Sequence, residues 1–374
     1  MLIQWLEENL SRGLRRAGLL LTLGAAFAVP ATVQAAGAGD GLAQALAQTQ
    51  AAMQKIQQQT QGALGTVIGQ SGGALGGTLQ QTFGNLSLVL RQASPGYVKQ
   101  TAGTTSVSGT ITWQNQARSY LLIRPQIATP GAPALLLLHA HGMTSSGMAN
   151  LTLAGRLATD YGVYVYLPQG KGNKWNEDPS STDKTDDVGF LSALVDHAVT
   201  VDGVDRTHVY AAGYSGGGFM AERLACQGSS TIAGFVAVAA TLRTSLTSRC
   251  SPLHGMAVAF IDGTSDLIVP YKGEPTVQSA AAAAAFWAGK NGCPAAQIST
   301  AALPQKVSDG TTVALTSFTA CPLDSAVSLY TVNGGGHTWP GSPDGAYTAF
   351  LGKTSQNLDA SIALWQFLIP YSLQ

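Results

Sequence analysis

A serine stands between glycines where an apolar run of the chain gives way to a helix-like one. Residues 209–220 read VYAAGYSGGGFM, and Ser215 is the centre of a Gly-x-Ser-x-Gly motif. The β-branched and aromatic residues before it predict a strand, and those after it predict a helix. Gly213 and Gly217 would let this turn close and lift the serine hydroxyl into open space. The motif alone also fits an ordinary glycine-rich turn, but its strand-to-helix context favours a nucleophile.

An acid and a histidine follow the serine in loops that come after two further predicted strands. Asp266 lies in the polar loop after the apolar residues 256–261, and His337 follows the apolar residues 328–333. Open parallel sheets hold their ligands at such strand ends. We therefore predict that Ser215, Asp266 and His337 act as nucleophile, acid and base. Asp262, nearer to the strand, is the alternative acid.

Two backbone N–H groups are predicted to stabilise an oxyanion. One belongs to Gly216, directly after the serine, and the other to Met143, in the glycine-rich loop after the apolar strand 133–139. His139 and His141 precede Met143 in that loop. They could be catalytic or bind a metal, but we expect them to brace the loop through hydrogen bonds.

Aromatic residues near these loops are candidates for the substrate-binding wall. We predict this role for Trp339, Trp175 and Tyr214, with packing in the core or against a loop as the alternative for the two tryptophans. The loop from Trp175 to Asp186 is long for a compact domain, which indicates a functional lid or rim.

Composition excludes several classes of protein. The chain has 374 residues, 45% hydrophobic residues and 44 glycines, enough for a folded core. The formal net charge is zero and only 11% of residues are charged, so nucleic-acid binding is not expected. The sequence has no Cys-x-x-Cys pair and no His-Glu-x-x-His helix. We therefore predict neither a metal site nor a cofactor.

The N-terminal part divides into two segments before the predicted catalytic domain. Residues 1–36 carry arginines, a short apolar run and small residues, as in an export signal, and the run is too short for a stable membrane span. Residues 37–95, rich in Ala, Gln and Gly, predict a leader or linker, with a surface-adsorbing segment as the alternative. We expect a secreted protein, extracellular or periplasmic, with its catalytic domain at 96–374.

Four cysteines in an exported chain predict two disulfides, for which three pairings are possible. We expect sequence neighbours to pair, so that Cys226 bonds to Cys250 and Cys293 bonds to Cys321.

Strand and helix patterns alternate from residue 133 to the C-terminus, after a predicted hairpin at 109–113 and 118–125. One helix is expected around residues 151–159. The alternation predicts an α/β fold of the α/β-hydrolase type, with a mostly parallel sheet flanked by helices on both faces.

Several stretches together resemble the polyhydroxybutyrate depolymerase family of secreted esterases, to which feruloyl and acetylxylan esterases are similar. They are DVGF at 187–190, VYAAGYSGGG at 209–218, DGTSD at 262–266 and GGGHTWPG at 334–341. The resemblance covers about residue 117 to the C-terminus. It implies the same roles for Ser215, Asp266 and His337, and it implies both disulfides. Tyr214 and Gly216 stand where many members have Leu and Asn.

These observations predict a secreted serine esterase that hydrolyses poly(3-hydroxyalkanoate) polymer or oligomers. Feruloyl or acetylxylan esterase activity on plant polysaccharide is the alternative within the same class. A non-catalytic module for adhesion to a surface or polymer is the alternative of another class. A serine peptidase is less expected, since no segment suggests the gating domain that such peptidases add.

Overall fold

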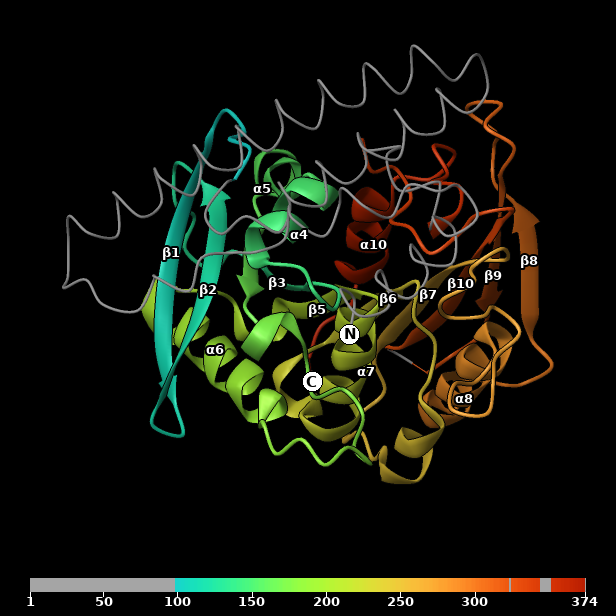
Figure 1. Ribbon diagram of the computed structural model, residues 1–374, viewed down its shortest axis with the longest axis horizontal. Helices are drawn as coiled ribbons and strands as arrows, with labels where there is room; N and C mark the ends of the chain where they lie inside the picture. The colour runs from blue at the N-terminus through green and yellow to red at the C-terminus, as the bar shows by residue number, and fades with distance from the viewer. Residues whose placement is uncertain (1–97, 323, 344–350, 374) are drawn as a thin grey trace, which may run out of the picture. The chain divides into compact units, whose positions relative to one another are not determined.

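Strands and helices alternate along the residues that the computed structural model describes, 98–322, 324–343 and 351–373 (Figure 1). The strands are β1 (Thr104–Trp113), β2 (Gln116–Pro125), β3 (Ala134–Leu138), β4 (Tyr164–Pro168), β5 (Val209–Tyr214), β6 (Gly234–Val238), β7 (Ala257–Gly263), β8 (Ile298–Ala302), β9 (Thr312–Phe318) and β10 (Ala326–Asn333). The α-helices are α4 (Ser145–Thr152), α5 (Ala154–Tyr161), α6 (Asp187–Asp202), α7 (Gly216–Gln227), α8 (Ala280–Asn291) and α10 (Ala360–Leu368).

All described residues belong to one compact unit of the chain, Gly84–Gln374. The predicted export signal, 1–36, and the predicted leader, 37–95, lie outside the described residues. These two segments and the domain start at residue 96 therefore stay predictions.

The described strands form one sheet in the order β1-β2-β4-β3-β5-β6-β7-β10-β9-β8. The six central strands, from β4 to β10, pair in parallel. Antiparallel hairpins, β1–β2 and β8–β9, extend the sheet at its two edges. Because the central strands are parallel, their carboxyl ends meet at one edge of the sheet. The predicted α/β fold with a mostly parallel sheet is confirmed.

Helices cover both faces of this sheet. Helices α6, α7 and α8 lie on one face, and α4, α5 and α10 lie on the other (Figure 1). Side chains of β3 alternate between the two cores: Leu136 and Leu138 pack with the first set of helices, and Leu135 and Leu137 with the second. All residues of β3 are buried, which explains its uninterrupted apolar sequence.

The edges and one helix differ from the sequence-based expectation. The β1–β2 hairpin was predicted, but the β8–β9 hairpin was not, and the residues of β8 are all exposed. The helix expected around 151–159 is two helices, α4 and α5, which meet at Leu153 in a left-handed conformation with φ of 51°. An exposed strand without alternating hydrophobicity and a left-handed leucine both lack the usual sequence signals.

Two disulfides fasten loops to the helical layer that contains α7 and α8. Cys226, in the last turn of α7, bonds to Cys250, and Cys293, just after α8, bonds to Cys321. The predicted pairing is confirmed. The bonds span 24 and 28 residues of sequence, so both constrain the unfolded chain to a similar degree.

Replacing both members of one disulfide should lower the free energy of unfolding. For Cys226→Ser with Cys250→Ser we expect a loss of about 3 kcal/mol, because the unfolded chain regains the entropy of the closed loop. Urea denaturation measures the loss. The pair Cys293→Ser with Cys321→Ser serves as the matched comparison and should show a similar loss. An unchanged midpoint and slope in both double variants would contradict this account.

Candidate active site

The turn from β5 into α7 holds Ser215 in a conformation that serine rarely adopts. Its φ and ψ are 54° and −119°, and α7 begins at the next residue. A Cβ on Gly213 would lie 2.1 Å from the carbonyl oxygen of Gly217, and a Cβ on Gly217 would lie 2.2 Å from that of Leu138. Side chains at these two positions are therefore excluded, as the motif predicts.

Three loops at the carboxyl ends of β5, β7 and β10 bring Ser215, Asp266 and His337 together. The Oγ atom of Ser215 lies 2.9 Å from Nε2 of His337, and Nδ1 of His337 lies 2.7 Å from Oδ2 of Asp266. A proton on Nδ1 is donated to the carboxylate, which leaves Nε2 free to accept the serine proton. The histidine and the aspartate are only 5% and 6% exposed. The predicted residues thus form one continuous hydrogen-bonded relay.

The carboxylate of Asp266 is held in place by its own loop. Its Oδ1 atom accepts hydrogen bonds from the backbone N–H groups of Ile268 and Val269, both at 2.8 Å. Asp262, the alternative acid, is in a different setting. Burial raises its pKa well above the usual range, with the charge of Asp266 adding to the effect. Its Oδ2 atom has no hydrogen-bond partner among the described residues. Asp266 is therefore the partner of the histidine, and Asp262 is a buried acid whose charged form is disfavoured.

Two of the predicted substrate-wall residues instead fix the loop that carries His337. The hydroxyl of Tyr214 donates to the carbonyl of His337 at 2.7 Å, and Nε1 of Trp339 donates to Oγ of Ser361 at 3.1 Å. Tyr214 and Trp339 are 6% and 1% exposed. Residues this buried do not form a substrate wall. The structure supports the packing alternative for Trp339, and the prediction for Tyr214 is corrected in the same way.

Trp175 and His139 lie together behind the glycine-rich loop. Trp175 is 2% exposed, and its Nε1 donates to the carbonyl of His139 at 2.8 Å, so it also packs rather than lining a wall. Nδ1 of His139 bonds to the carbonyl of Ala140, and Nε2 accepts from the N–H of Gly170 at 2.9 Å. Burial lowers the pKa of His139 to about 4. The expected bracing role is confirmed for this neutral histidine.

His141 lies beside the turn that carries the serine, a position that the sequence did not indicate. Its ring lies against Gly216, where an added Cβ would be 2.3 Å from the ring carbon Cδ2. The side chain is 47% exposed, so it borders the open space beside the serine. Glu177 anchors it: one carboxylate oxygen lies 3.2 Å from Nε2 of His141 and the other lies 2.8 Å from Arg243. Sequence spacing cannot reveal the contact between Glu177 and Arg243, because these two residues lie 66 positions apart.

Glu177 stays charged in spite of its buried position. Burial alone would raise its pKa, but the hydrogen bond and charge of His141 and the charge of Arg243 together lower it. The anionic carboxylate of Glu177 binds the imidazole of His141 through one oxygen and the guanidinium of Arg243 through the other. The three side chains form a fixed polar wall next to Gly216.

The two backbone donors predicted for an oxyanion hole differ in their surroundings. Gly216 is the first residue of α7, and N–H groups in the first turn of a helix have no intrahelical acceptor. The N–H of Met143 donates to the carbonyl of Ala140 at 3.0 Å. A role for Met143 would require this turn bond to be shared or broken, so its part in the site stays a prediction.

Among residues 98–322, 324–343 and 351–373, no group of three or more His, Cys, Asp and Glu side chains is arranged to hold a metal ion. No helix in the same part of the chain is long and apolar enough to cross a membrane.

Curated relatives of this chain are esterases by name. The chain is 28% identical over 310 residues to the protein named "Putative esterase NocK" of Nocardia uniformis subsp. tsuyamanensis, covering 76% of this chain and 88% of that one. It is also 28% identical over 221 residues to "Feruloyl esterase B" of Piromyces equi, covering 55% of this chain but 39% of that protein. No protein-family profile matches the chain.

Solved structures are more distant. An acetyl xylan esterase from Aspergillus awamori is 13% identical, with a TM-score of 0.48 over 62% of this chain and 94% of that one. A likeness at this level carries no argument about the substrate.

The bracing histidine predicts how stability changes with pH. The pKa of His139 is about 4 in the folded protein, against 6.5 for an unperturbed histidine. Between these values the unfolded chain binds a proton that the folded chain does not, so stability falls as pH falls from about 6.5 to about 4. The full loss is about 3 kcal/mol. In His139→Gln the free energy of unfolding, measured in urea from pH 4 to 7, should depend less on pH than in the wild type.

The control for this measurement is His254→Gln, which changes a partly exposed histidine outside the loop of His139. The change of slope in His139→Gln is judged against the change in this variant. If the slope of His139→Gln equals that of the wild type, His139 is not neutral in the folded protein.

Proposed function

We propose that this protein is a carboxylic ester hydrolase that acts through an acyl-enzyme on Ser215. The observation that carries the proposal is the relay from Ser215 through His337 to Asp266, with distances of 2.9 and 2.7 Å at the ends of three strands. A fixed nucleophile, base and orienting carboxylate are what acyl transfer needs. A module that only adheres to a polymer would not need all three groups in register.

The chemistry follows from the positions of these atoms. The Oγ atom of Ser215 attacks the ester carbonyl while His337 takes the proton of the serine. Asp266 stabilises the imidazolium that forms. The N–H of Gly216 stabilises the oxyanion, a contribution typically worth about 3 kcal/mol per donor. His337 then protonates the leaving alcohol. A water molecule, activated by the same imidazole, releases the acid and restores the serine.

The choice of esters over peptides rests on the relatives. Both curated relatives are named as esterases, and they match this chain over 76% and 55% of its length. Ester hydrolysis is the chemistry that their names share.

For the substrate, the names favour an ester on a plant polysaccharide. One relative is a feruloyl esterase, so we propose feruloyl or acetyl groups on a cell-wall polysaccharide as the first candidate. This reverses the order of the sequence-based expectation, in which the polyester came first.

Hydrolysis of poly(3-hydroxyalkanoate) remains a second candidate because of exposed apolar side chains on the loop of Asp266. Leu267 and Ile268 are 86% and 48% exposed, directly after the catalytic acid. An apolar polymer surface would cover such side chains favourably. The resemblance of the motifs to polyhydroxybutyrate depolymerases points in the same direction.

We also propose that the enzyme works outside the cytoplasm, in the periplasm or the extracellular space. The two disulfides favour an oxidising compartment. The predicted export signal at residues 1–36 would deliver the chain there.

Hydrolysis assays test the activity and its substrate. The full chain should hydrolyse 4-nitrophenyl acetate, and kcat/KM should be higher on methyl ferulate or acetylated xylan than on a hydroxybutyrate trimer. Ser215→Ala should lower kcat on each by at least about 10⁴-fold with the fold intact by circular dichroism. A folded Ser215→Ala variant that keeps its activity would refute the nucleophile. A folded wild type inactive on every ester would favour the adhesion module.

The two buried aspartates should differ sharply on substitution. Asp266→Asn should lower kcat by about 10⁴-fold, because the amide no longer fixes the tautomer of His337 or stabilises its positive form. Asp262→Asn replaces a buried carboxyl by an amide of the same shape and leaves the bond between Asp266 and His337 in place, so it should keep kcat within about threefold. Steady-state kinetics on 4-nitrophenyl acetate compares them. A larger loss of kcat in Asp262→Asn than in Asp266→Asn would make Asp262 the catalytic acid.

A further inference from the structure

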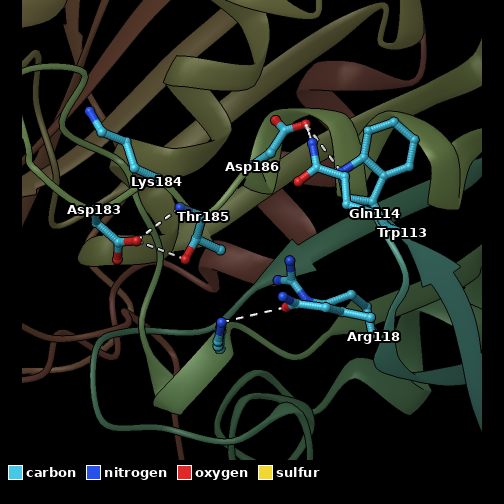
Figure 2. Close-up of a pocket in the computed structure, with 9 residues that line it drawn as sticks. Trp113, Gln114, Arg118, Asp183, Lys184, Thr185 and Asp186 are labelled. Carbon is cyan, nitrogen blue, oxygen red and sulfur yellow. Dashed lines mark hydrogen bonds between the residues drawn. The ribbon is translucent and has the colours of Figure 1, made fainter.

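A pocket of about 350 Å³ lies between the tip of the β1–β2 hairpin and the segment that leads into α6 (Figure 2). From the hairpin, Trp113, Gln114 and Arg118 face it. From the segment, Lys184 and Asp186 line the other side. None of these residues belongs to the relay of Ser215. Lys184 and Asp186 end the loop 175–186 that the sequence predicts to be a lid or rim, and the residues of the hairpin were not predicted.

This pocket opens on the same edge of the sheet as the relay. Strand β2 is antiparallel to β4, with Tyr120 opposite Pro168, so the start of β2 lies at the carboxyl end of β4. The hairpin tip therefore rises beside the loops that follow the parallel strands. In the sheet, β2, β4 and β3 lead in order to β5, the strand that ends at the serine.

A chain of contacts joins the floor of the pocket to the nucleophile. Arg118 pairs with Asp187 at 2.6 Å, and the other oxygen of Asp187 accepts the N–H of Asn176 at 2.8 Å. The next residue, Glu177, holds His141, whose ring lies against Gly216. These contacts are mostly buried, and they fix the position of the pocket relative to the loop beside the serine.

Hydrogen bonds hold side chains of the pocket in place before any ligand binds. Asp186 accepts hydrogen bonds from Nε1 of Trp113 and Nε2 of Gln114, both at 3.1 Å. Its other oxygen accepts the N–H of Gly189 and so caps α6. Figure 2 shows Trp113 and Gln114 converging on this carboxylate. Side chains fixed in this way lose little conformational entropy when a ligand arrives.

The chemistry of the lining indicates a neutral ligand rich in hydroxyl groups. The charge of Arg118 is balanced by Asp187, and the lining also holds two lysines, Lys171 and Lys184, and two aspartates, Asp183 and Asp186. Donors and acceptors are thus both present, without an excess of either charge. Trp113 adds an indole against which the C–H face of a sugar ring can pack.

We propose that this pocket is a subsite for a sugar unit of the polysaccharide whose ester is cleaved at Ser215. The proposal rests on the proposed esterase function and specifies its substrate class. A polyester chain fits the pocket poorly. Its interior offers ester oxygens that only accept hydrogen bonds, whereas the side chains that line the pocket include acceptors as well as donors. Sugar hydroxyls supply both donors and acceptors.

Equilibrium binding without turnover tests the subsite. The full-length Ser215→Ala protein is titrated with unesterified xylohexaose, cellohexaose and a hydroxybutyrate trimer by isothermal titration calorimetry. We expect binding of at least one hexaose and not of the trimer. Adding Trp113→Ala should raise Kd for that sugar at least about tenfold, because the stacking surface is lost. No binding of either hexaose by the folded protein, or a Kd unchanged by Trp113→Ala, would overturn the proposal.

A milder variant guards against misfolding of Trp113→Ala. Gln116→Ala removes an exposed amide of the pocket, and we expect a Kd raised about threefold or more. Gln297→Ala, an exposed glutamine just before β8 at the opposite edge of the sheet, is the matched control and should keep the Kd of the parent protein. Equal Kd values for Gln116→Ala and Gln297→Ala would count against the subsite.

The outcome is independent of the esterase proposal. Binding of unesterified sugar requires no catalysis, and hydrolysis of 4-nitrophenyl acetate requires no sugar. Esterase activity without sugar binding would overturn the subsite alone. Sugar binding without esterase activity would overturn the proposed function and leave a sugar-binding pocket that serves no cleavage at Ser215.

Discussion

The tight passage of the chain from β5 into α7 is the constraint on which the site depends. Gly213 lets the first turn of α7 fold back against the end of β5, and Gly217 lets α7 pass close to β3. A methyl group at either position would collide with a backbone oxygen. Ser215 between them has a positive φ, a conformation that typically costs about 1–3 kcal/mol. Buried neighbouring strands on both sides of β5 hold it there. In this conformation its Oγ lies 2.9 Å from Nε2 of His337.

Much of this arrangement is readable from the sequence because it is local. Ser215, Asp266 and His337 each follow an apolar strand, and parallel pairing brings those strand ends to one edge. The orientation of side chains that contact residues far away in the sequence could not be predicted. Trp175 and Trp339 lie in the right loops, yet their indole N–H groups turn inward to a carbonyl and a hydroxyl. A sequence shows that an aromatic residue is near a site but not which way it faces.

The edge that carries the relay has two different flanks. On the side of β2 and β4 lies the polar pocket organised by Asp186, and on the side of β7 lies the apolar pair Leu267 and Ile268. The polar flank suits a hydroxylated chain, and the apolar flank suits an acyl or aromatic group. A feruloylated polysaccharide has both parts, with the ester bond between them. The two substrate hypotheses therefore differ in which flank they use most.

Asp262 has a consequence for the electrostatics around His337. The positive imidazolium formed during attack meets the carboxylate of Asp266, and burial raises the pKa of Asp262, which disfavours a second negative charge nearby. Both members of that ion pair are almost completely shielded from solvent. Mobile ions screen exposed charges far more than buried ones. Added salt should therefore alter how a polymer adsorbs to the surface while leaving the chemical step at the serine nearly untouched.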